Sequence, residues 1–187
     1  MSVVDKYACL TVSYLRLEEL MIADCPNLIS IPSIGGSSSL LSLRLDGCKG
    51  LKSLPSGLPT CTSLQYLGIS NCTNLKAIPE DVGQLRSLQD LYIKRCQNLK
   101  RFPEEHLGCL TRLKTLELDP FSEELEEFPG VNSIHHLYSS LEDLTLFGWK
   151  RLSSLPDQLQ GSYWKLCHCL WKTSPFFEFW EFWIVRI

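Results

Sequence analysis

Leucine and isoleucine recur along the chain in a pattern that repeats about every 24 residues. Each copy reads Leu-x-x-Leu-x-(Leu or Ile), and the copies follow one another at intervals of 23, 24, 24, 25 and 28 residues. They begin at Leu17, Leu40, Leu64, Leu88, Leu113 and Leu141. Apolar residues at every second position indicate a β-strand with one buried face. In the third copy, Leu67 and Ile69 are therefore expected in the core, and Tyr66, Gly68 and Ser70 on the opposite face.

The rest of each copy predicts a turn followed by an irregular arm. A cysteine stands three residues after the last apolar strand position in the first four copies, and Phe121 and Trp149 take its place in the last two. Each arm contains an apolar residue followed by proline, as at Ile78 and Pro79. Because proline has no backbone N–H, it cannot extend a strand ladder. The arm is therefore expected to return the chain while its apolar side chains fill the same interior.

A single unit of this kind cannot bury both sides of its apolar wedge, so several units must stack. The predicted fold is an α/β solenoid of leucine-rich repeats. Its parallel strands line a concave face, and irregular or short-helical arms form the convex side. We divide the chain into an incomplete N-terminal repeat or cap at 1–16, six leucine-rich repeats at 17–160, and a non-repeat tail at 161–187.

The tail is rich in aromatic residues and lacks the repeat. It holds nine of the 19 aromatic residues of the chain, and no spacing in it fits a helix or a strand for long. These residues are Tyr163, Trp164, Trp171, Phe176, Phe177, Phe179, Trp180, Phe182 and Trp183. Charged residues interrupt the segment, so no membrane span is expected. We interpret the tail as poorly ordered read-through sequence, and alternatively as a cap over the apolar edge of the last repeat.

The repeat Leu-x-x-Leu-x-Ile-x-x-Cys-x-x-Leu-x-x-(Leu, Ile or Phe)-Pro, with arms such as 78–88, resembles a known family. It is similar to the C-terminal leucine-rich repeats of plant nucleotide-binding disease resistance proteins. The resemblance covers Leu17 to Gln160. It implies a fragment of a cytoplasmic receptor of plant innate immunity. In that family the repeats sense a pathogen effector or a guarded host protein, and contact with the receptor's own nucleotide-binding domain contributes to autoinhibition.

Besides its non-repeat tail, the chain departs from that family in lacking a nucleotide-binding motif. It has no Gly-x-x-x-x-Gly-Lys-(Ser or Thr) loop, and the run from Gly35 to Ser39 has no lysine to meet a phosphate. We therefore do not expect nucleotide binding, and we interpret this run as a flexible arm. A leucine-rich-repeat substrate receptor of a ubiquitin ligase is the alternative function, because such proteins use similar repeats to present a target.

Composition and charge exclude several classes of function. The chain of 187 residues has 18 basic and 21 acidic side chains and a net charge of −3, which argues against a nucleic-acid partner or a polybasic membrane anchor. The nine cysteines form no closely spaced framework, so reduced thiols in the cytoplasm are expected. The first ten residues lack the basic and apolar stretches of a secretory signal.

No motif in the sequence points to catalysis, a metal or a cofactor. The triplet Cys167-His168-Cys169 has no second pair of ligands nearby to complete a zinc site. The cysteines of the repeats are explained by packing in the turn, and no nucleophile motif such as Gly-x-Ser-x-Gly is present. We expect a non-catalytic protein.

The outward positions of the predicted strands are the candidate partner-binding residues. They combine both charges with tyrosine, a composition typical of protein interfaces. An ordinary exposed sheet without a ligand is the alternative. The candidates are Arg44, Asp46, Tyr66, Asp90, Tyr92, Lys94, Glu117 and Asp143.

Overall fold

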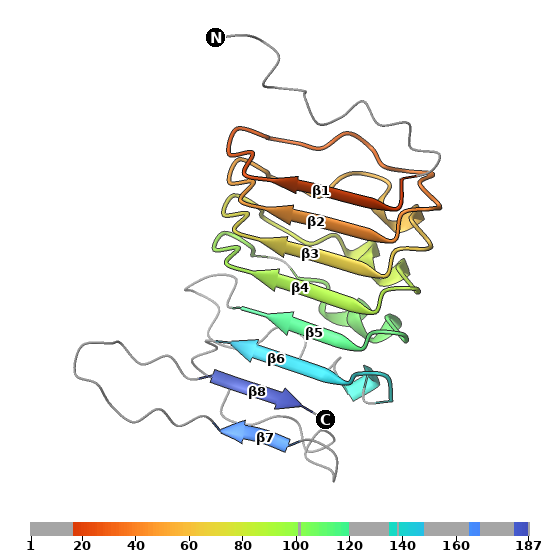
Figure 1. Cartoon of the computed structure of the whole chain (residues 1–187), viewed down its shortest axis with the longest axis vertical. Coiled ribbons are helices and arrows are strands. Elements are labelled where there is room, and N and C mark those ends of the chain that lie inside the picture. Colours follow the sequence, from red (N-terminus) through yellow and green to blue (C-terminus); the bar gives the residue numbers. More distant parts are fainter. Residues whose placement is uncertain are drawn as a thin grey trace, which may run out of the picture.

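Six parallel strands form the body of the protein. The structure, a computed structural model, describes residues 17–100, 102–119, 135–137, 139–147, 165–168 and 182–186. The strands lie side by side in chain order, one to a repeat, as the rungs of the ladder in Figure 1. They are β1 (Glu19–Ala23), β2 (Ser42–Asp46), β3 (Tyr66–Ser70), β4 (Asp90–Lys94), β5 (Thr115–Leu118) and β6 (Asp143–Phe147). Each strand begins two residues after the first leucine of its copy, as the alternation predicts.

The strands pair at equivalent positions of the repeat, so identical side chains stack. The second strand position gives a continuous row of leucines, of which the first is 7% exposed and the others are fully buried. The row is Leu20, Leu43, Leu67, Leu91, Leu116 and Leu144. Burying one such side chain contributes about 1.5–3 kcal/mol. This row and the parallel row that includes Leu45, Ile69 and Ile93 form the centre of the core.

The chain leaves each of the first four strands through the same turn. The residue after the strand has left-handed backbone geometry, with φ of 51° at Asp24, 64° at Gly47, 54° at Asn71 and 52° at Arg95. Glycine adopts this region freely and Asp or Asn tolerate it, whereas Arg95 is an uncommon occupant. The Gly47 N–H donates to the Ser70 carbonyl at 3.1 Å, and the equivalent bonds recur in the neighbouring turns. The turn therefore links successive repeats.

The cysteine after each turn residue faces the interior. Cys48, Cys72 and Cys96 are fully buried, and Cys25 is half-buried. The Cys96 thiol donates to the Lys94 carbonyl at 3.4 Å, and the Cys48 thiol donates to the Asp46 carbonyl at 3.6 Å. The four turn cysteines are free thiols, as are Cys61 and Cys109. The small, weakly polar thiol thus fills a buried turn and also satisfies a strand-end carbonyl.

The arms carry short 3-10 helices, which confirms the predicted fold. These are η3 (Leu58–Thr60), η4 (Glu80–Gln84), η5 (Glu104–Cys109) and η6 (His135–Leu137). They lie to one side of the sheet and behind it, so that one face of the sheet is left open (Figure 1). We call this face, which bears the outward residues of β1–β6, the open face. The chain is a leucine-rich-repeat solenoid, and its open face is the surface predicted to be concave.

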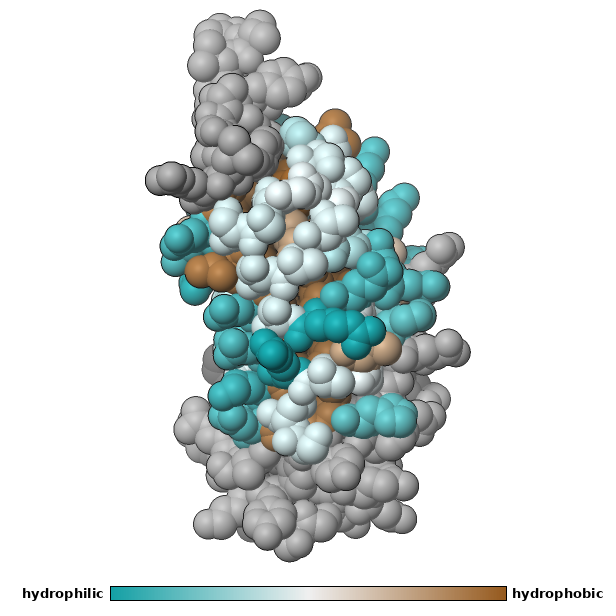
Figure 2. All heavy atoms as spheres, turned by 90° about the vertical axis from the view of Figure 1, so that its right-hand side faces the viewer, coloured by the Kyte–Doolittle hydropathy of each residue, from teal (hydrophilic) through white to brown (hydrophobic). Residues whose placement is uncertain are grey.

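The Gly/Ser run of the first arm is a packed turn. The Gly36 N–H donates to Thr60 Oγ1 at 3.2 Å, and the Ile34 N–H donates to the Ser56 carbonyl at 3.1 Å. A Cβ atom on Gly57 would lie 2.5 Å from Cα of Gly35, so this contact between arms requires glycine. The prediction of a flexible arm is therefore wrong here. Figure 2, in which the right-hand side of Figure 1 faces the viewer, shows mainly hydrophilic and near-neutral residues with small hydrophobic areas between them.

Two strands of the tail extend the sheet beyond β6. These are β7 (Lys165–His168) and β8 (Phe182–Arg186), with β8 antiparallel to β6 and β7 antiparallel to β8 at the edge (Figure 1). We expected no regular structure after residue 161. The structure differs from this expectation because β8 pairs with backbone groups that β6, the last parallel strand, leaves open. Such pairing needs no particular spacing of apolar residues. This arrangement supports the interpretation of the tail as a cap.

Other sequence-based expectations cannot be compared with the structure. The N-terminal unit at 1–16, the arm of the fifth repeat at 120–134 and the segment at 148–164 lie outside the described residues. Among the residues that are described, no helix is long and apolar enough to cross a membrane.

Candidate partner-binding surface

All eight candidate residues lie on the open face. Strand alternation places them in three columns that run across the repeats, on the side opposite the buried leucines. The first column contains Tyr66, Asp90 and Asp143, the middle column contains Arg44, Tyr92 and Glu117, and the third column contains Asp46 and Lys94. The predicted strand register is therefore confirmed. That these residues bind a partner remains a prediction.

Four of these side chains stack on one another across three strands. The Tyr66 and Tyr92 rings are stacked, with centroids 5.3 Å apart and an interplanar angle of 29°. The guanidinium carbon of Arg44 lies 4.3 Å from the Tyr66 centroid, and Lys94 Nζ lies 5.6 Å from the Tyr92 centroid. We call Arg44, Tyr66, Tyr92 and Lys94 the aromatic row. Stacking and cation–π contacts of this kind each contribute about 0.5–1.5 kcal/mol and fix the side chains in place.

Gly68 makes the aromatic row possible. It pairs with Arg44 on one side and Tyr92 on the other, so it is the middle residue of that column. A Cβ atom at this position would lie 2.8 Å from Cε1 and 2.9 Å from the hydroxyl oxygen of Tyr66. Without a side chain there, the Tyr66 ring lies over Gly68, which is buried although it faces outward. Sequence reasoning missed this role, although glycine inside a strand often marks such a close approach.

A shallow hollow of about 280 Å³ lies beside the row. Its lining includes Met21, Arg44, Tyr66, Tyr92 and Lys94, together with Gly68. The volume is just below the range of sites for small-molecule ligands, about 300–1,000 Å³, and is suited to a side chain of a partner. The Met21 side chain is 62% exposed, so it offers apolar surface at the border of the hollow. The sequence analysis did not include Met21 among the candidates.

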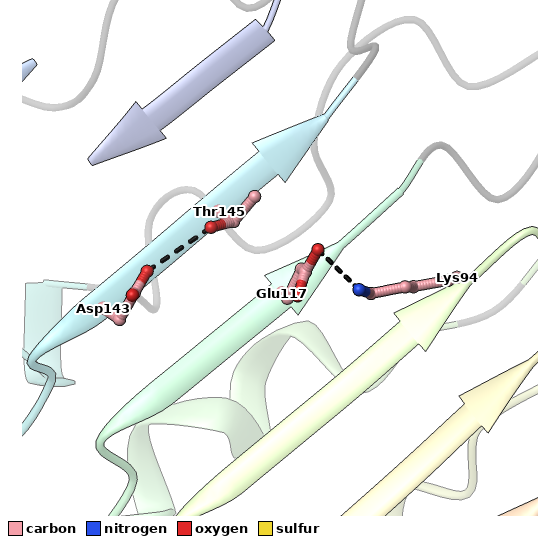
Figure 3. Close-up of polar contacts among 4 residues, drawn as sticks. All are labelled: Lys94, Glu117, Asp143 and Thr145. Carbon is pink, nitrogen blue, oxygen red and sulfur yellow. Dashed lines mark hydrogen bonds and ion pairs between the residues drawn. The ribbon is translucent and has the colours of Figure 1, made fainter. Parts of the chain in front are cut away.

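An ion pair continues the row onto β5. Lys94 Nζ lies 2.7 Å from Glu117 Oε1, and the two side chains are 38% and 25% exposed. On β6, the Thr145 hydroxyl donates to Asp143 Oδ1 at 3.4 Å. Figure 3 shows these four side chains on adjacent strands, with Lys94 and Glu117 pointing toward one another. The ion pair therefore joins β4 to β5, and the hydrogen bond lies within β6.

The open face concentrates the negative charge of the chain. It carries six acidic and two basic residues and therefore has a net charge of −4, whereas the whole chain has a net charge of −3. The acids are Glu19, Asp46, Asp90, Glu117, Asp119 and Asp143, and the bases are Arg44 and Lys94. The residues outside this face thus carry a small positive net charge. The negative charge of the chain is therefore located on the open face.

Three groups on this face have shifted pKa values. Burial, opposed by nearby Lys94, raises the pKa of Asp119. Burial, reinforced by the negative charge of Asp90, raises the pKa of Tyr92. Hydrogen bonds from Asn71, whose Nδ2 lies 2.9 Å from Asp46 Oδ1, and from Ser70 lower the pKa of Asp46. Asp46 is therefore held by the end of β3 and the turn that follows it, whereas burial makes the ionised form of Asp119 less favourable.

The described residues contain no group of three or more His, Cys, Asp or Glu side chains that could hold a metal ion. A hydrogen bond with Cys48, together with burial, raises the pKa of the Cys72 thiol, and burial raises that of Cys96 to about 11. Thiols of this kind stay protonated and are poor nucleophiles. Cys169, the last residue of the triplet considered for zinc, lies outside the described residues.

Comparison with known proteins gives a likeness of fold. No protein-family model and no curated protein matches the chain. Among solved structures, the chain is similar to a leucine-rich-repeat protein of Leptospira interrogans, with 19% sequence identity and a TM-score of 0.38. The match covers 79% of this chain and 47% of that protein. At this identity the similarity concerns the fold alone.

Proposed function

We propose that the chain is a non-catalytic protein-recognition module that binds its partner through the open face. The observation that carries this proposal is the aromatic row, which holds two tyrosines, an arginine and a lysine in fixed positions beside a hollow. Tyrosine and arginine are the residues most often responsible for binding energy at protein interfaces. Their fixed arrangement supports binding because little side-chain entropy remains to be lost.

The fold supplies the rigidity that recognition requires. The open face is backed by the fully buried leucine row, and each strand is hydrogen-bonded to its neighbours. Six repeats together present one continuous surface wider than any single repeat. Leucine-rich-repeat proteins generally serve as binding scaffolds and not as enzymes, which is in keeping with this proposal.

We further propose that the module belongs to a cytoplasmic receptor of plant innate immunity. The support is the sequence resemblance, namely the cysteine-containing repeat and arms of the type seen at 78–88. The partner is then a pathogen effector, a guarded host protein or the receptor's own nucleotide-binding domain. Sequencing the complete transcript tests this setting. An upstream Gly-x-x-x-x-Gly-Lys-(Ser or Thr) loop supports it, whereas an F-box would favour the ubiquitin-ligase alternative.

A display selection tests the binding surface. Small folded domains or peptides that bind the chain are selected, and their affinity is compared for two variants. The first variant, Tyr66→Ala with Tyr92→Ala, removes the aromatic row and should weaken most binders by more than tenfold, since central tyrosines carry about 1–2 kcal/mol or more each.

The second variant is the matched control on the arm. It replaces the exposed residues Glu80, Gln84 and Arg86 with alanine and should leave binding unchanged. If the arm variant abolishes binding while the tyrosine variant does not, the recognition surface lies on the other side of the solenoid.

A further inference from the structure

The charge of the open face and the hollow beside the aromatic row together describe a partner. Resting on the proposed function, we infer that the partner is a basic protein segment with one apolar side chain and a lysine or arginine about 10 Å away. The apolar side chain enters the hollow beside the aromatic row. The basic side chain reaches the carboxylates of β4–β6.

The hollow fits an apolar anchor. Met21 and the two tyrosine rings supply apolar surface, and the volume of about 280 Å³ admits one side chain. Both cations at its border are already engaged, since Arg44 lies against the Tyr66 ring and Lys94 pairs with Glu117. Asp46 and Ser70 also line the hollow, and Asp46 accepts hydrogen bonds from Asn71 and Ser70. An anionic side chain would lose hydration beside Asp46 without an unengaged cation to pair with, whereas an apolar side chain gains contact with Met21 and the tyrosine rings.

The carboxylates on the following strands fit a basic residue. Asp90 on β4, Glu117 and Asp119 around β5, and Asp143 on β6 all lie on the open face. Of the residues on this face, only Lys94 is a base within this group, and it pairs with Glu117. Burial and the charge of Glu117 raise the pKa of Asp119, and Lys94 and Arg95 offset this only in part, so an added cation would further favour its ionised form.

The spacing of the strands sets the length of the binding segment. Adjacent strands lie about 4.8 Å apart, so the hollow over β3 and the carboxylates around β5 are separated by about 10 Å. An extended chain advances about 3.3 Å per residue, so a segment crossing the strands places its basic residue three or four positions from the anchor. An acidic segment and the phosphates of a nucleic acid are disfavoured by the net charge of −4.

Synthetic peptides test the inference directly. Fluorescence polarisation is used to measure the binding of labelled ten-residue peptides to the full chain. Two basic peptides carry a leucine anchor with lysines three and four residues before or after it, and matched peptides carry glutamine or glutamate in place of the lysines. One basic peptide should bind at least about tenfold more tightly than its glutamine counterpart, and higher salt should weaken it. The glutamate peptides should bind most weakly.

Matched variants locate the binding site. Asp90→Asn with Asp143→Asn should reduce the affinity for the basic peptide about tenfold. Glu80→Gln with Asp81→Asn removes two exposed carboxylates from the arm and should leave the affinity unchanged. Circular dichroism verifies that each variant is folded. The anchor is tested separately with a peptide in which serine replaces leucine, which should also bind about tenfold more weakly.

The outcomes separate this inference from the proposed function. Tighter binding of the glutamate peptides, lost on Tyr66→Ala with Tyr92→Ala, would overturn the basic partner but leave recognition by the open face standing. Basic-peptide binding that is indifferent to both the tyrosine and the carboxylate variants would overturn both proposals. If neither basic peptide binds, the inference is wrong, and the display selection decides the proposed function independently.

Discussion

The Tyr66 ring lies over the backbone of Gly68, so close that a Cβ atom there would come within 2.8 Å of the ring. Gly68 also pairs with Arg44 and Tyr92 on the flanking strands. The ring therefore occupies space that a side chain at 68 would fill, and it contacts Arg44 at 4.3 Å and Tyr92 at 5.3 Å from its centre. One missing side chain on β3 thus determines how three neighbouring strands present their side chains.

Gly68→Ala should disrupt the aromatic row without unfolding the protein. The methyl group displaces the Tyr66 ring, which costs the stacking energy of about 0.5–1.5 kcal/mol. Alanine in a strand recovers about 0.5–1 kcal/mol relative to glycine, so the free energy of unfolding should change little. The coupling between Tyr66→Leu and Tyr92→Leu, measured by a double-mutant cycle in urea, should fall to nearly zero in the Gly68→Ala background. An undiminished coupling would show that Gly68 does not position the ring.

Truncating a side chain of the buried row should cost far more than truncating one on the open face. Leu67 and Leu91 are fully buried, whereas Tyr66 and Tyr92 are half-buried. Leu67→Ala or Leu91→Ala should lower the free energy of unfolding by about 2–5 kcal/mol, and Tyr66→Ala or Tyr92→Ala by much less. Urea denaturation measures the difference. Equal losses at the leucines and tyrosines would contradict the strand register.

The repeat made the strands and the core predictable. Every strand begins two residues after the first leucine of its copy, because alternation within a short apolar pattern leaves a single way to bury it. Stacking of identical repeats then fixes the register, so that Leu43 pairs with Leu67 and Leu67 with Leu91. The face on which each candidate residue lies follows from the same alternation.

The aromatic row was not predictable in the same way. Alternation gives the face of a residue, but not the direction in which its side chain leans along that face. Tyr66 and Tyr92 belong to different columns, and they meet only because the Tyr66 ring leans over Gly68. Similarly, the pairing of β8 with β6 depends on backbone groups at the edge of the sheet, which no pattern of side chains in the tail reveals.

Replacing Arg95 with glycine should stabilise the protein. Arg95 follows β4 with φ of 52°, a region that costs a residue with a Cβ atom about 1–2 kcal/mol. Glycine removes this cost, but its greater conformational entropy stabilises the unfolded chain by about 0.4–1 kcal/mol. The free energy of unfolding should therefore rise by about 0.5–1 kcal/mol. Arg95→Gln is the control, because it removes the charge without relieving the backbone. If both variants are equally stable in urea, the left-handed turn at this position carries no strain.

Burial should order the cysteines by reactivity. Cys48, Cys61, Cys72 and Cys96 are fully buried, which keeps a reagent from reaching their sulfur atoms. Burial also raises the pKa of Cys96 to about 11, so about one Cys96 thiol in a thousand is ionised at pH 8. Among the cysteines whose burial the structure describes, iodoacetamide should modify the half-buried Cys25 and Cys109 before these four in the folded protein. After denaturation without reductant, all nine cysteines should react. Peptide mass spectrometry measures both, and rapid labelling of Cys72 in the folded protein would contradict the buried turn.

Asp119 and Asp46 should affect stability in opposite directions. Because burial raises the pKa of Asp119, its ionised form is less favourable in the folded than in the unfolded protein. The resulting penalty is absent below the unfolded pKa of about 3.9 and grows as pH rises through the folded pKa. Asp119→Asn should therefore raise the free energy of unfolding at pH 7, with an effect that disappears as the pH approaches 3.5.

Asp46→Asn should show the reverse behaviour, since hydrogen bonds from Asn71 and Ser70 lower the pKa of Asp46. The stability that ionised Asp46 contributes is present above its unfolded pKa and is lost as pH falls through the folded pKa. The variant should thus be less stable than the wild type at pH 7 and approach it in acid. Urea denaturation of both variants from pH 3.5 to 7 measures the two slopes. Slopes of the same sign would show that the two carboxylates, both on the open face, do not differ in environment as their neighbours imply.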